Sequence, residues 1–579
     1  MKNQVLTYFM WGYQTHFRAE MERYSRQAFA ALGASIELNA LLVGVRLPDV
    51  ANDHLVCIEP EDEEWDISTF TEVHRRADEI CTTHPDQNLY YGDEPSMLDK
   101  PENIRRKSVR EAIQEVLSGL DADRGTYSFC GLPVRLGNFH VAPVLYAAKS
   151  DIDAFPNLEK PFQLQEWSST TGIVQALTSH LLAQISDKLS TREPGRFFGV
   201  FDSDYSGLLR KAGTTLCDAI TLALKDIHLQ GVFENLNKIS ELRYEGGETL
   251  GTIIFSCKDL PTLNHQISLR RPISLSSHKL ARKVIEISDK QLGCICQGRE
   301  GLVGFGSIND FGDYPIFRAV FTGHYQWSLH ANETLLMNCA FGVPSVPQPR
   351  LSWDDFFSNV RRILVGLTVE QGEALWEAVS AAMDQRHGTM LVLSDAASIE
   401  SDRLGGQAIG IEPIRLNSGL VARISGIDGA VLVDRDCNCH AIGVILDGKA
   451  TNRGDSSRGA RYNSAVRYAC SSQAPVVCLV VSEDGYVNMV PTLRPQIRRQ
   501  DVETHVEMLK SLTSDNYHAV RTWLDDRRFY LTSDQCDIVN AELSRIQDEP
   551  QELGEIRIIT PVFSPDPEMN GSYYIEELT

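Results

Sequence analysis

The stretch GAVLVDRDCNCHAIGVIL, residues 429–446, holds two apolar runs separated by a short polar segment. Each run is short and rich in aliphatic residues, as is typical of a strand in a buried sheet. The same pattern predicts strands at 387–395 (HGTMLVLSD), 411–416 (IEPIRL) and 475–490 (PVVCLVVSEDGYVNMV). Helical patterns alternate with these runs, so the sequence predicts an α/β domain over residues 355–498 with a mostly buried sheet.

Three helices are expected in and beside this sheet. They are SWDDFFSNVRRIL (352–364), TVEQGEALWEAVSAAMDQ (368–385) and ARYNSAVRYACSS (460–472). Thr368 stands where it can cap the second helix, and Gln371 three residues later completes a capping box. The second helix is therefore expected to begin at residue 369.

The rest of the chain divides by composition, because 579 residues are too many for one core. The sequence pattern predicts an α/β region of one or two lobes over residues 1–270 and a small β-rich subdomain over residues 271–345. The proline-rich stretch GVPSVPQPRL (342–351) predicts a stiff linker. The pattern over residues 500–579 predicts a helical segment that ends in an acidic tail. Within this tail, EIRIITPVF (555–563) has the pattern of a strand.

Individual elements are predicted from hydrophobic spacing and from turn residues. Helices are expected at 17–32, 170–189, 206–224, 276–288, 502–512, 515–526 and 533–546. Strands are expected at 37–48 and 249–256, and a hairpin at 292–308.

The composition argues against several classes of protein. The chain carries 78 acidic and 55 basic residues, a formal net charge of −23. A protein that binds nucleic acids in general, or the surface of a membrane, needs a positively charged surface to attract phosphate groups, so neither class is expected. No secretory signal and no membrane span are expected from the sequence, and the thirteen scattered cysteines fit reduced thiols in a cytoplasmic protein.

Two cysteine pairs, Cys294/Cys296 and Cys437/Cys439, invite comparison with zinc sites. Zinc sites usually leave about two to four residues between paired cysteines, whereas one residue separates the cysteines here. On a strand, two residues at this spacing simply face the same side. We therefore expect no structural metal at either pair.

Two acidic motifs stand at the ends of expected strands. Asp428-Gly429-Ala430 leads into one strand, and Ser482-Glu483-Asp484-Gly485 follows another. Taken singly, each motif is more often a simple turn. A carboxylate at a strand end, outside the sheet, is also well placed to hold a ligand or a metal.

A third motif, SRGARYNSAVRYA (457–469), is basic in an acidic chain. Arg458 and Gly459 precede a helix that begins near Ala460, and backbone N–H groups at a helix start form an anion site. Arg461 lies in the first turn, where a cation opposes the helix dipole unless an anion intervenes. An ion pair of Arg461 with a nearby carboxylate is an equally good interpretation, the candidates being Asp434, Asp436 and Asp455.

Taken together, the three motifs suit a nucleoside triphosphate bound through Mg²⁺ or Mn²⁺. Such a metal takes oxygen ligands from a few carboxylates, here Asp428 and Glu483, and from the phosphates.

In this order the motifs resemble the diadenylate cyclase (DAC) domain family. The resemblance covers roughly residues 360–498 and rests on HGTMLVLSD, IDGAVLVD, CHAIGVIL, SRGARYNSA and VVCLVVSEDGYV. It implies a mixed central β-sheet flanked by helices. The preceding α+β region, which includes YFMWGYQTHFR (8–18), more loosely resembles the sensor regions found before DAC domains in some bacterial proteins.

The resemblance implies a reaction and a set of site residues. Each domain of a homo-oligomer binds one ATP, two domains meet face to face, and the two ATP molecules give cyclic di-AMP and two pyrophosphates under control of the sensor region. Asp428, Arg461 and Glu483 are then catalytic, with Asp428 and Glu483 as ligands of Mg²⁺ or Mn²⁺. The residues expected to contact the nucleotide are Gly429, Ala430, Arg458, Gly459, Ala460, Tyr462, Ser464 and Ser482.

The helix start departs from the family pattern G-T-R-H-R-A-A. Gly459, Arg461 and Ala465 match it, whereas four positions differ: Ala460, Tyr462, Asn463 and Ser464. Two alternatives therefore stay open, a DAC-like nucleotide-binding module with little or no catalysis and a cyclase that makes a different cyclic nucleotide. The retained carboxylates Asp428 and Glu483 favour catalysis, because a pure binder has little use for both.

Overall fold

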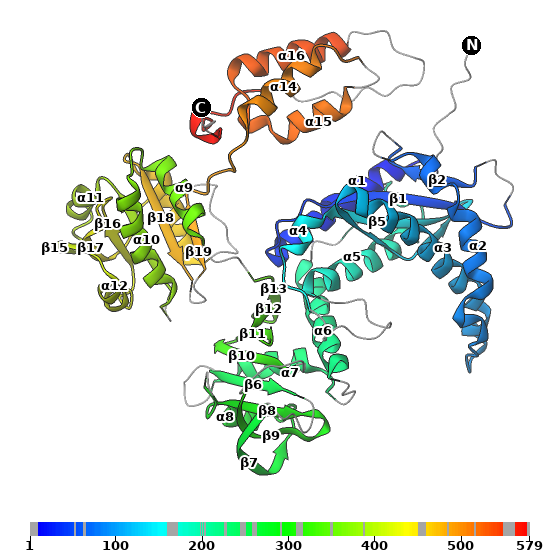
Figure 1. The fold of residues 1–579 in the computed structure, drawn as a ribbon, viewed down its shortest axis with the longest axis horizontal. Helices are drawn as coiled ribbons and strands as arrows, with labels where there is room; N and C mark the ends of the chain where they lie inside the picture. The colour runs from blue at the N-terminus through cyan, green and yellow to red at the C-terminus, as the bar shows by residue number, and fades with distance from the viewer. Residues whose placement is uncertain are drawn as a thin grey trace. The chain divides into compact units, whose positions relative to one another are not determined.

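The chain divides into two units, Met1–Gln348 and Pro349–Thr579 (Figure 1). The division falls inside the proline-rich stretch 342–351. The fold is mixed α/β, as predicted. The computed structural model describes residues 10–50, 54–61, 65–158, 172–196, 199, 201, 204–224, 229–243, 250–256, 263–289, 292–308, 316–347, 351–385, 388–449, 459–482, 486–513, 517–547 and 562–575.

The first sheet of unit 1 is antiparallel, and its strand order is β2-β1-β5-β3, with β4 also paired to β5. Its strands are β1 (Asn39–Arg46), β2 (Val56–Glu59), β3 (Thr126–Cys130), β4 (Val134–Leu136) and β5 (Phe139–Ala148). The helices of this part are α1 (Gln14–Leu32), α2 (Val73–Thr83), α3 (Glu94–Arg124), α4 (Lys149–Asp153), α5 (Ile173–Leu189) and α6 (Tyr205–Ala223).

Alternating residues of this sheet enter two separate cores. Leu42 and Val141 belong to a large core with side chains of α1, α5 and α6. Val43 and Val144, on the opposite face, pack with side chains of α2 and α3. The sheet is therefore covered by helices on both faces (Figure 1).

A second sheet of unit 1 has eight strands in the order β13-β12-β11-β10-β6-β8-β9-β7. They are β6 (Gly251–Phe255), β7 (Leu263–Ile273), β8 (Gly293–Gln297), β9 (Gly301–Ile308), β10 (Phe317–Gly323), β11 (Gln326–Ala331), β12 (Thr334–Ala340) and β13 (Val343–Ser345). Two helices accompany it, α7 (Val232–Glu241) and α8 (His278–Ile285).

The expected boundary at residue 270 falls within β7, and β6 before it pairs with β8 and β10, so this sheet begins before residue 271. The predicted hairpin at 292–308 is confirmed, because β8 and β9 pair antiparallel. Cys294 and Cys296 are both buried in the large core, on the same side of β8 as the spacing predicted.

The sheet of unit 2 has six strands in the order β15-β17-β16-β14-β18-β19. They are β14 (Thr389–Ser394), β15 (Ile409–Arg415), β16 (Ala430–Val433), β17 (Asn438–Val444), β18 (Val476–Val481) and β19 (Val487–Val490). Its helices are α9 (Trp353–Ile363), α10 (Val369–Met383), α11 (Ala397–Arg403), α12 (Ser418–Ile424) and α13 (Ala460–Ser471). Strands β14 and β16 are parallel and the other pairs are antiparallel, so the sheet is mixed, as the resemblance implied.

Both faces of this sheet are covered along its centre. Leu391 and Val431 pack with α9, α10 and α12, whereas Val392 and Leu432 pack with α11 and α13. Strands β14, β16 and β18 are buried along their whole length, but the edge strand β15 is largely exposed. The prediction of a mostly buried sheet therefore holds for the central strands and is wrong for β15, which has a neighbour on one side only.

The predicted capping box is present at the start of α10. The Thr368 hydroxyl accepts a hydrogen bond from the Gln371 N–H at 3.2 Å, and the Gln371 side chain accepts one from the Thr368 N–H at 3.0 Å. Cys437 and Cys439 are both buried in the core beneath α10, as their spacing predicted.

Unit 2 ends in a helical segment with its own core. Its helices are α14 (Arg499–Leu509), α15 (His518–Asp526) and α16 (Ser533–Gln547), and residues 555–561 of the expected strand lie outside the described residues. Arg362 of α9 touches this segment: its guanidinium donates to the Arg494 carbonyl oxygen at 3.2 Å and lies 4.6 Å from the Tyr573 ring centroid. Within the described part of the chain, no helix combines the length and the apolar character that crossing a bilayer requires.

Candidate functional site

Strand register brings two of the three motifs to one edge of the unit 2 sheet. Ala430 of β16 and Val480 of β18 both lie opposite Met390 of β14. Neighbouring strands are about 4.8 Å apart, so these two positions lie about 10 Å apart. The Asp428 turn before β16 and Ser482 after β18 therefore leave the sheet at the same edge.

Gly429 holds the Asp428 turn tightly against the end of β17. Its φ is +113°, and a Cβ at this position would lie 2.6 Å from the carbonyl carbon of Gly443 and 2.9 Å from the backbone nitrogen of Val444. Only glycine fits such a backbone and such a contact. The Gly429 N–H donates to Asp428 Oδ1 at 3.1 Å, which orients the carboxylate.

The third motif reaches the same place through Arg461. Its Nη2 lies 3.5 Å from Asp428 Oδ1, and the Asp428 side chain is 96% exposed. An exposed ion pair at this distance is worth little in water, about 0–1 kcal/mol. Both side chains are therefore held close together and remain open to a ligand.

The expected ion-pair partners of Arg461 are engaged elsewhere. Asp434 accepts a hydrogen bond from His440 Nε2 at 2.9 Å, and Asp436 accepts one from Gln371 Nε2 at 2.7 Å. The ion-pair interpretation is therefore wrong for these two acids, and the partner of Arg461 is the motif carboxylate Asp428. Asp455 lies outside the described residues.

Helix α13 begins at Ala460, as predicted. Gly459 is its N-cap residue, and among the described residues no side chain caps the helix and no acid lies in its first turn. The side chain of Asn463 donates to the Gly459 carbonyl oxygen at 3.3 Å, so it does not serve as a cap. The partial positive charge of the helix start is therefore left without an acid of its own beside Arg461.

The other predicted residues vary in their exposure. Ala430 is buried, Gly459 and Ala460 are exposed, and Tyr462 and Ser464 are half-buried. The Ser482 hydroxyl accepts a hydrogen bond from the Tyr486 N–H at 3.1 Å, so it joins the end of β18 to the residue before β19. Two predicted residues, Arg458 and Glu483, lie outside the described residues.

A polar network that the sequence analysis missed fixes the orientation of α13. The buried Tyr468 donates its hydroxyl to Glu400 Oε2 at 2.8 Å, and Arg403 donates to both Glu400 and Asp447. Burial, followed by the hydrogen bond to Glu400, raises the pKa of the Tyr468 phenol, and the bond from Arg403 lowers the pKa of Glu400. The spacing of Glu400 and Arg403, three residues apart on one helix, is the one signal that the sequence offered.

Within the described ranges, no group of three or more His, Cys, Asp or Glu side chains is arranged to hold a metal ion. At the sheet edge, the described part of the three motifs contributes the carboxylate of Asp428. A metal ion bound to Asp428 would take its other coordinating atoms from residues outside the described part of the motifs, or from a bound small molecule.

Three family models match the chain. Residues 376–492 match the DAC model, described as "DisA bacterial checkpoint controller nucleotide-binding". Residues 10–217 match "Probable sensor domain DACNG", and residues 230–333 match "Probable sensor domain DACNH". The match confirms the resemblance carried by the motifs of unit 2.

Two solved structures are similar to part of this chain. The crystal structure of a double-cysteine variant of DacA from Staphylococcus aureus is 18% identical, with 21% of this chain and 87% of that chain covered and a TM-score of 0.18. A hypothetical membrane spanning protein from Bacillus cereus is 23% identical, with 23% and 64% covered and a TM-score of 0.18. The comparison with curated proteins finds no match.

Proposed function

Because residues 376–492 form a DAC domain that follows two sensor domains, we propose that this chain is a diadenylate cyclase. It condenses two ATP molecules into cyclic di-AMP and releases two pyrophosphates. The observation that carries the proposal is the meeting of Asp428 and Arg461 at 3.5 Å, at an exposed edge of the sheet and beside an uncapped helix start.

In the proposed reaction the 3′-oxygen of each ATP bonds to the α-phosphorus of the other, and the bond from that phosphorus to the pyrophosphate breaks. Asp428 orients the 3′-hydroxyl and accepts its proton. Arg461, together with the N–H groups at the start of α13, balances the negative charge on the phosphates. Catalysis of this kind depends on positioning and on charge stabilisation.

The exposed carboxylate of Asp428 suits Mg²⁺ or Mn²⁺. These ions use one or two carboxylates and complete their shell with water and phosphate oxygens. When bound, the ion supplies positive charge against the triphosphate. Glu483 is the proposed second ligand, because it follows Ser482 in the sequence and Ser482 lies at the same edge of the sheet as the Asp428 turn.

The remaining proposed contacts follow the geometry of the edge. Gly429 and Ala430 line the nucleotide where the turn enters β16, and Ser482 stands beside the phosphates. Around the start of α13, the proposed contacts are Arg458, Gly459, Ala460, Tyr462 and Ser464.

We further propose that two DAC domains meet face to face across this edge. Exposed isoleucines beside Asp428 support such a surface, because Ile409, Ile427 and Ile445 are 57%, 40% and 64% exposed. Ile409 and Ile427 both approach Gly443, so they lie together next to the turn. A cluster of exposed aliphatic side chains beside a polar site is typical of a protein contact.

The domain organisation is part of the proposal. Two sensor domains, matched over 10–217 and 230–333, control a DAC domain over 355–498, which the helical segment 500–579 follows. A cytoplasmic location is supported by the ATP substrate and by thirteen cysteines suited to a reducing compartment.

The full chain incubated with labelled ATP and Mg²⁺ or Mn²⁺, with products identified by mass, tests the reaction. We expect cyclic di-AMP from the wild type and a loss of about 100-fold or more in rate for Asp428→Asn. Asp402→Asn, which neutralises an exposed acid of α11, is the matched control and should retain the wild-type rate. If no metal yields a cyclic dinucleotide, the proposal fails, and if the two variants are equally active, the role of Asp428 is wrong.

The same assay separates the two alternatives. ATP binding without any cyclic product would support a DAC-like binding module, and a cyclic product of another mass would support a different cyclase.

A further inference from the structure

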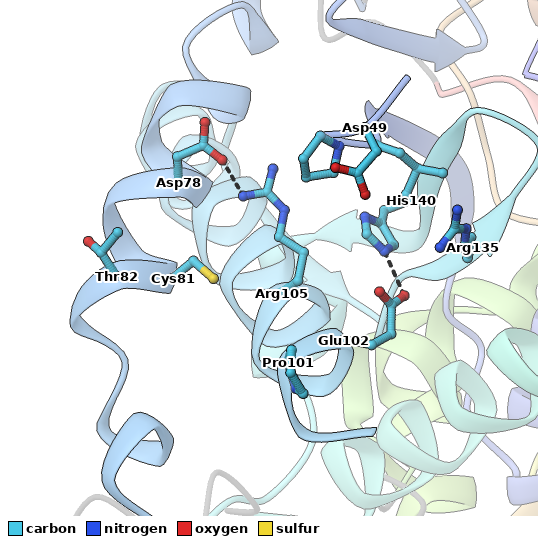
Figure 2. Close-up of a pocket in the computed structure, with 11 residues that line it drawn as sticks. Asp49, Asp78, Cys81, Thr82, Pro101, Glu102, Arg105, Arg135 and His140 are labelled. Carbon is cyan, nitrogen blue, oxygen red and sulfur yellow. Dashed lines mark hydrogen bonds and ion pairs between the residues drawn. The ribbon is translucent and has the colours of Figure 1, made fainter. Parts of the chain in front are cut away.

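A cavity of about 480 Å³ lies in unit 1, far along the chain from the DAC motifs (Figure 2). Its volume falls in the range of small-molecule sites, about 300–1,000 Å³. Six polar residues of its lining come from α2, α3, β4, β5 and the loop after β1: Asp49, Asp78, Glu102, Arg105, Arg135 and His140. Figure 2 shows Arg105 between Asp78 on one side and Asp49 with His140 on the other.

Arg105 carries two hydrogen-bond donor groups that have no acceptor. Its side chain is 9% exposed, and Nη1 forms an ion pair with Asp78. Within the described part of the chain, the buried Nε and Nη2 have no hydrogen-bond partner. Leaving such donors unsatisfied costs about 1–3 kcal/mol, and more for a charged group, so an acceptor supplied on this edge of the guanidinium would remove that cost.

His140, in contrast, has a buried ring nitrogen that lacks a hydrogen-bond partner among the described residues. Its side chain is 1% exposed, and Nε2 lies 2.8 Å from Glu102 Oε1. Burial lowers the pKa of His140, against the opposing effect of Glu102, which favours the neutral ring, and the Glu102 carboxylate is the acceptor of the hydrogen bond from Nε2. Nδ1 is then a buried acceptor, and it has no donor partner.

The charges around these atoms restrict the ligand further. A simple anion drawn to Arg105 would also face the carboxylates of Asp49, Asp78 and Glu102. A simple cation would face the guanidiniums of Arg105 and Arg135. A molecule that carries one carboxylate and one ammonium group meets an opposite charge at each end.

We propose that this pocket binds a small zwitterion of the α-amino-acid class. The ligand carboxylate accepts from Nε and Nη2 of Arg105, which form the parallel fork that suits a carboxylate. The ligand ammonium donates to Nδ1 of His140 and to the exposed carboxylate of Asp49. This inference concerns unit 1 and does not depend on cyclase activity.

The ligand reaches these atoms through a rearrangement of the lining. Nε, Nη2 and Nδ1 are shielded from solvent, whereas the side chains of Asp78 and Glu102 are 53% and 43% exposed and have room to move. The pair Arg105–Asp78 joins α3 to α2. A carboxylate bound to Arg105 therefore acts directly on the contact between these two helices.

Binding to the full chain tests the proposal without reference to the cyclase reaction. The probes are the common L-amino acids, presented singly at millimolar concentration, with thermal shift as the screen and calorimetry for any response. For each amino acid that binds, the probes also include its deamino acid, its decarboxylated amine and inorganic phosphate. We expect at least one amino acid to bind and its three matched probes not to bind.

Three variants locate the site. Arg105→Met should weaken binding by about tenfold or more, because it removes a charged donor pair. Asp49→Asn, an exposed position, should weaken it without endangering the fold and serves if the Arg105 variant does not fold. Arg110→Met alters an exposed arginine of the same helix outside the pocket and should leave affinity unchanged.

Four results would overturn the proposal. They are no response to any amino acid, an equal response to phosphate or to the deamino acid, wild-type affinity in Arg105→Met, and wild-type affinity in Asp49→Asn.

Discussion

Replacement of Gly429 by alanine should loosen the edge of the sheet that carries the candidate site. A non-glycine residue at φ +113° costs about 1–3 kcal/mol of backbone strain. The new Cβ would also lie 2.6 Å and 2.9 Å from backbone atoms of β17, and such overpacking costs about 1–3 kcal/mol. We therefore expect Gly429→Ala to lower the local stability of the β16–β17 pair by about 2–6 kcal/mol.

Amide hydrogen exchange measured by mass spectrometry on peptides covering residues 427–446 gives this quantity locally. A loss of 2 kcal/mol corresponds to a rise of about 30-fold in the opening equilibrium of these amides. Gly426→Ala, three residues earlier, is the matched control, because a Cβ there would come no nearer than 3.9 Å to another atom. Equal protection in the two variants would refute the assignment of a tight Gly429–Gly443 contact.

Three further predictions concern other parts of the chain. Thr368→Ala should destabilise α10 by about 1 kcal/mol through loss of its cap, seen as faster amide exchange in its first turn. Burial lowers the pKa of His330 to about 4, so between that value and about pH 6.5 the unfolded chain binds a proton that the folded chain does not. The free energy of unfolding of unit 1 should therefore fall by up to about 3 kcal/mol as the pH falls through this window. In urea titrations, the stability of His330→Gln should depend less on pH than that of the wild type. Among the described cysteines Cys470 is the exposed one, so iodoacetamide should modify it first. Burial raises the pKa of Cys437 to about 11, so this thiol should stay unmodified in the folded protein. Modification of the two cysteines at equal rates would contradict this prediction.

The central elements of unit 2 were predictable because their sequence signals are local. Short aliphatic runs gave β14, β16 and β18, and the Thr368/Gln371 spacing gave the start of α10. The exposure of β15 was not predictable, because it depends on β15 lying at the edge of the sheet. Likewise, β6 joins the eight-stranded sheet through long-range pairing that no local pattern reports.

The candidate site was predictable as three motifs but not as one arrangement. Strand order decides that Asp428 and Ser482 leave the sheet at the same edge, since β14 lies between β16 and β18. Asp428 precedes β16 and Asp434 follows it, so the two acids lie at opposite ends of that strand, and Arg461 pairs with Asp428. The network around Tyr468 joins segments almost 70 residues apart, beyond the reach of spacing rules.

The contact of Arg362 with the C-terminal segment has a practical consequence for anyone who wishes to study the DAC domain alone. Burial against this segment lowers the pKa of Arg362. The guanidinium donates a hydrogen bond to the Arg494 carbonyl oxygen and packs against the Tyr573 ring. A fragment cut at residue 498 would keep the charge and lose the ring that shields one face of it. An expression unit that keeps this contact therefore includes α9 and extends beyond Tyr573, so that the helical segment is retained with the DAC domain.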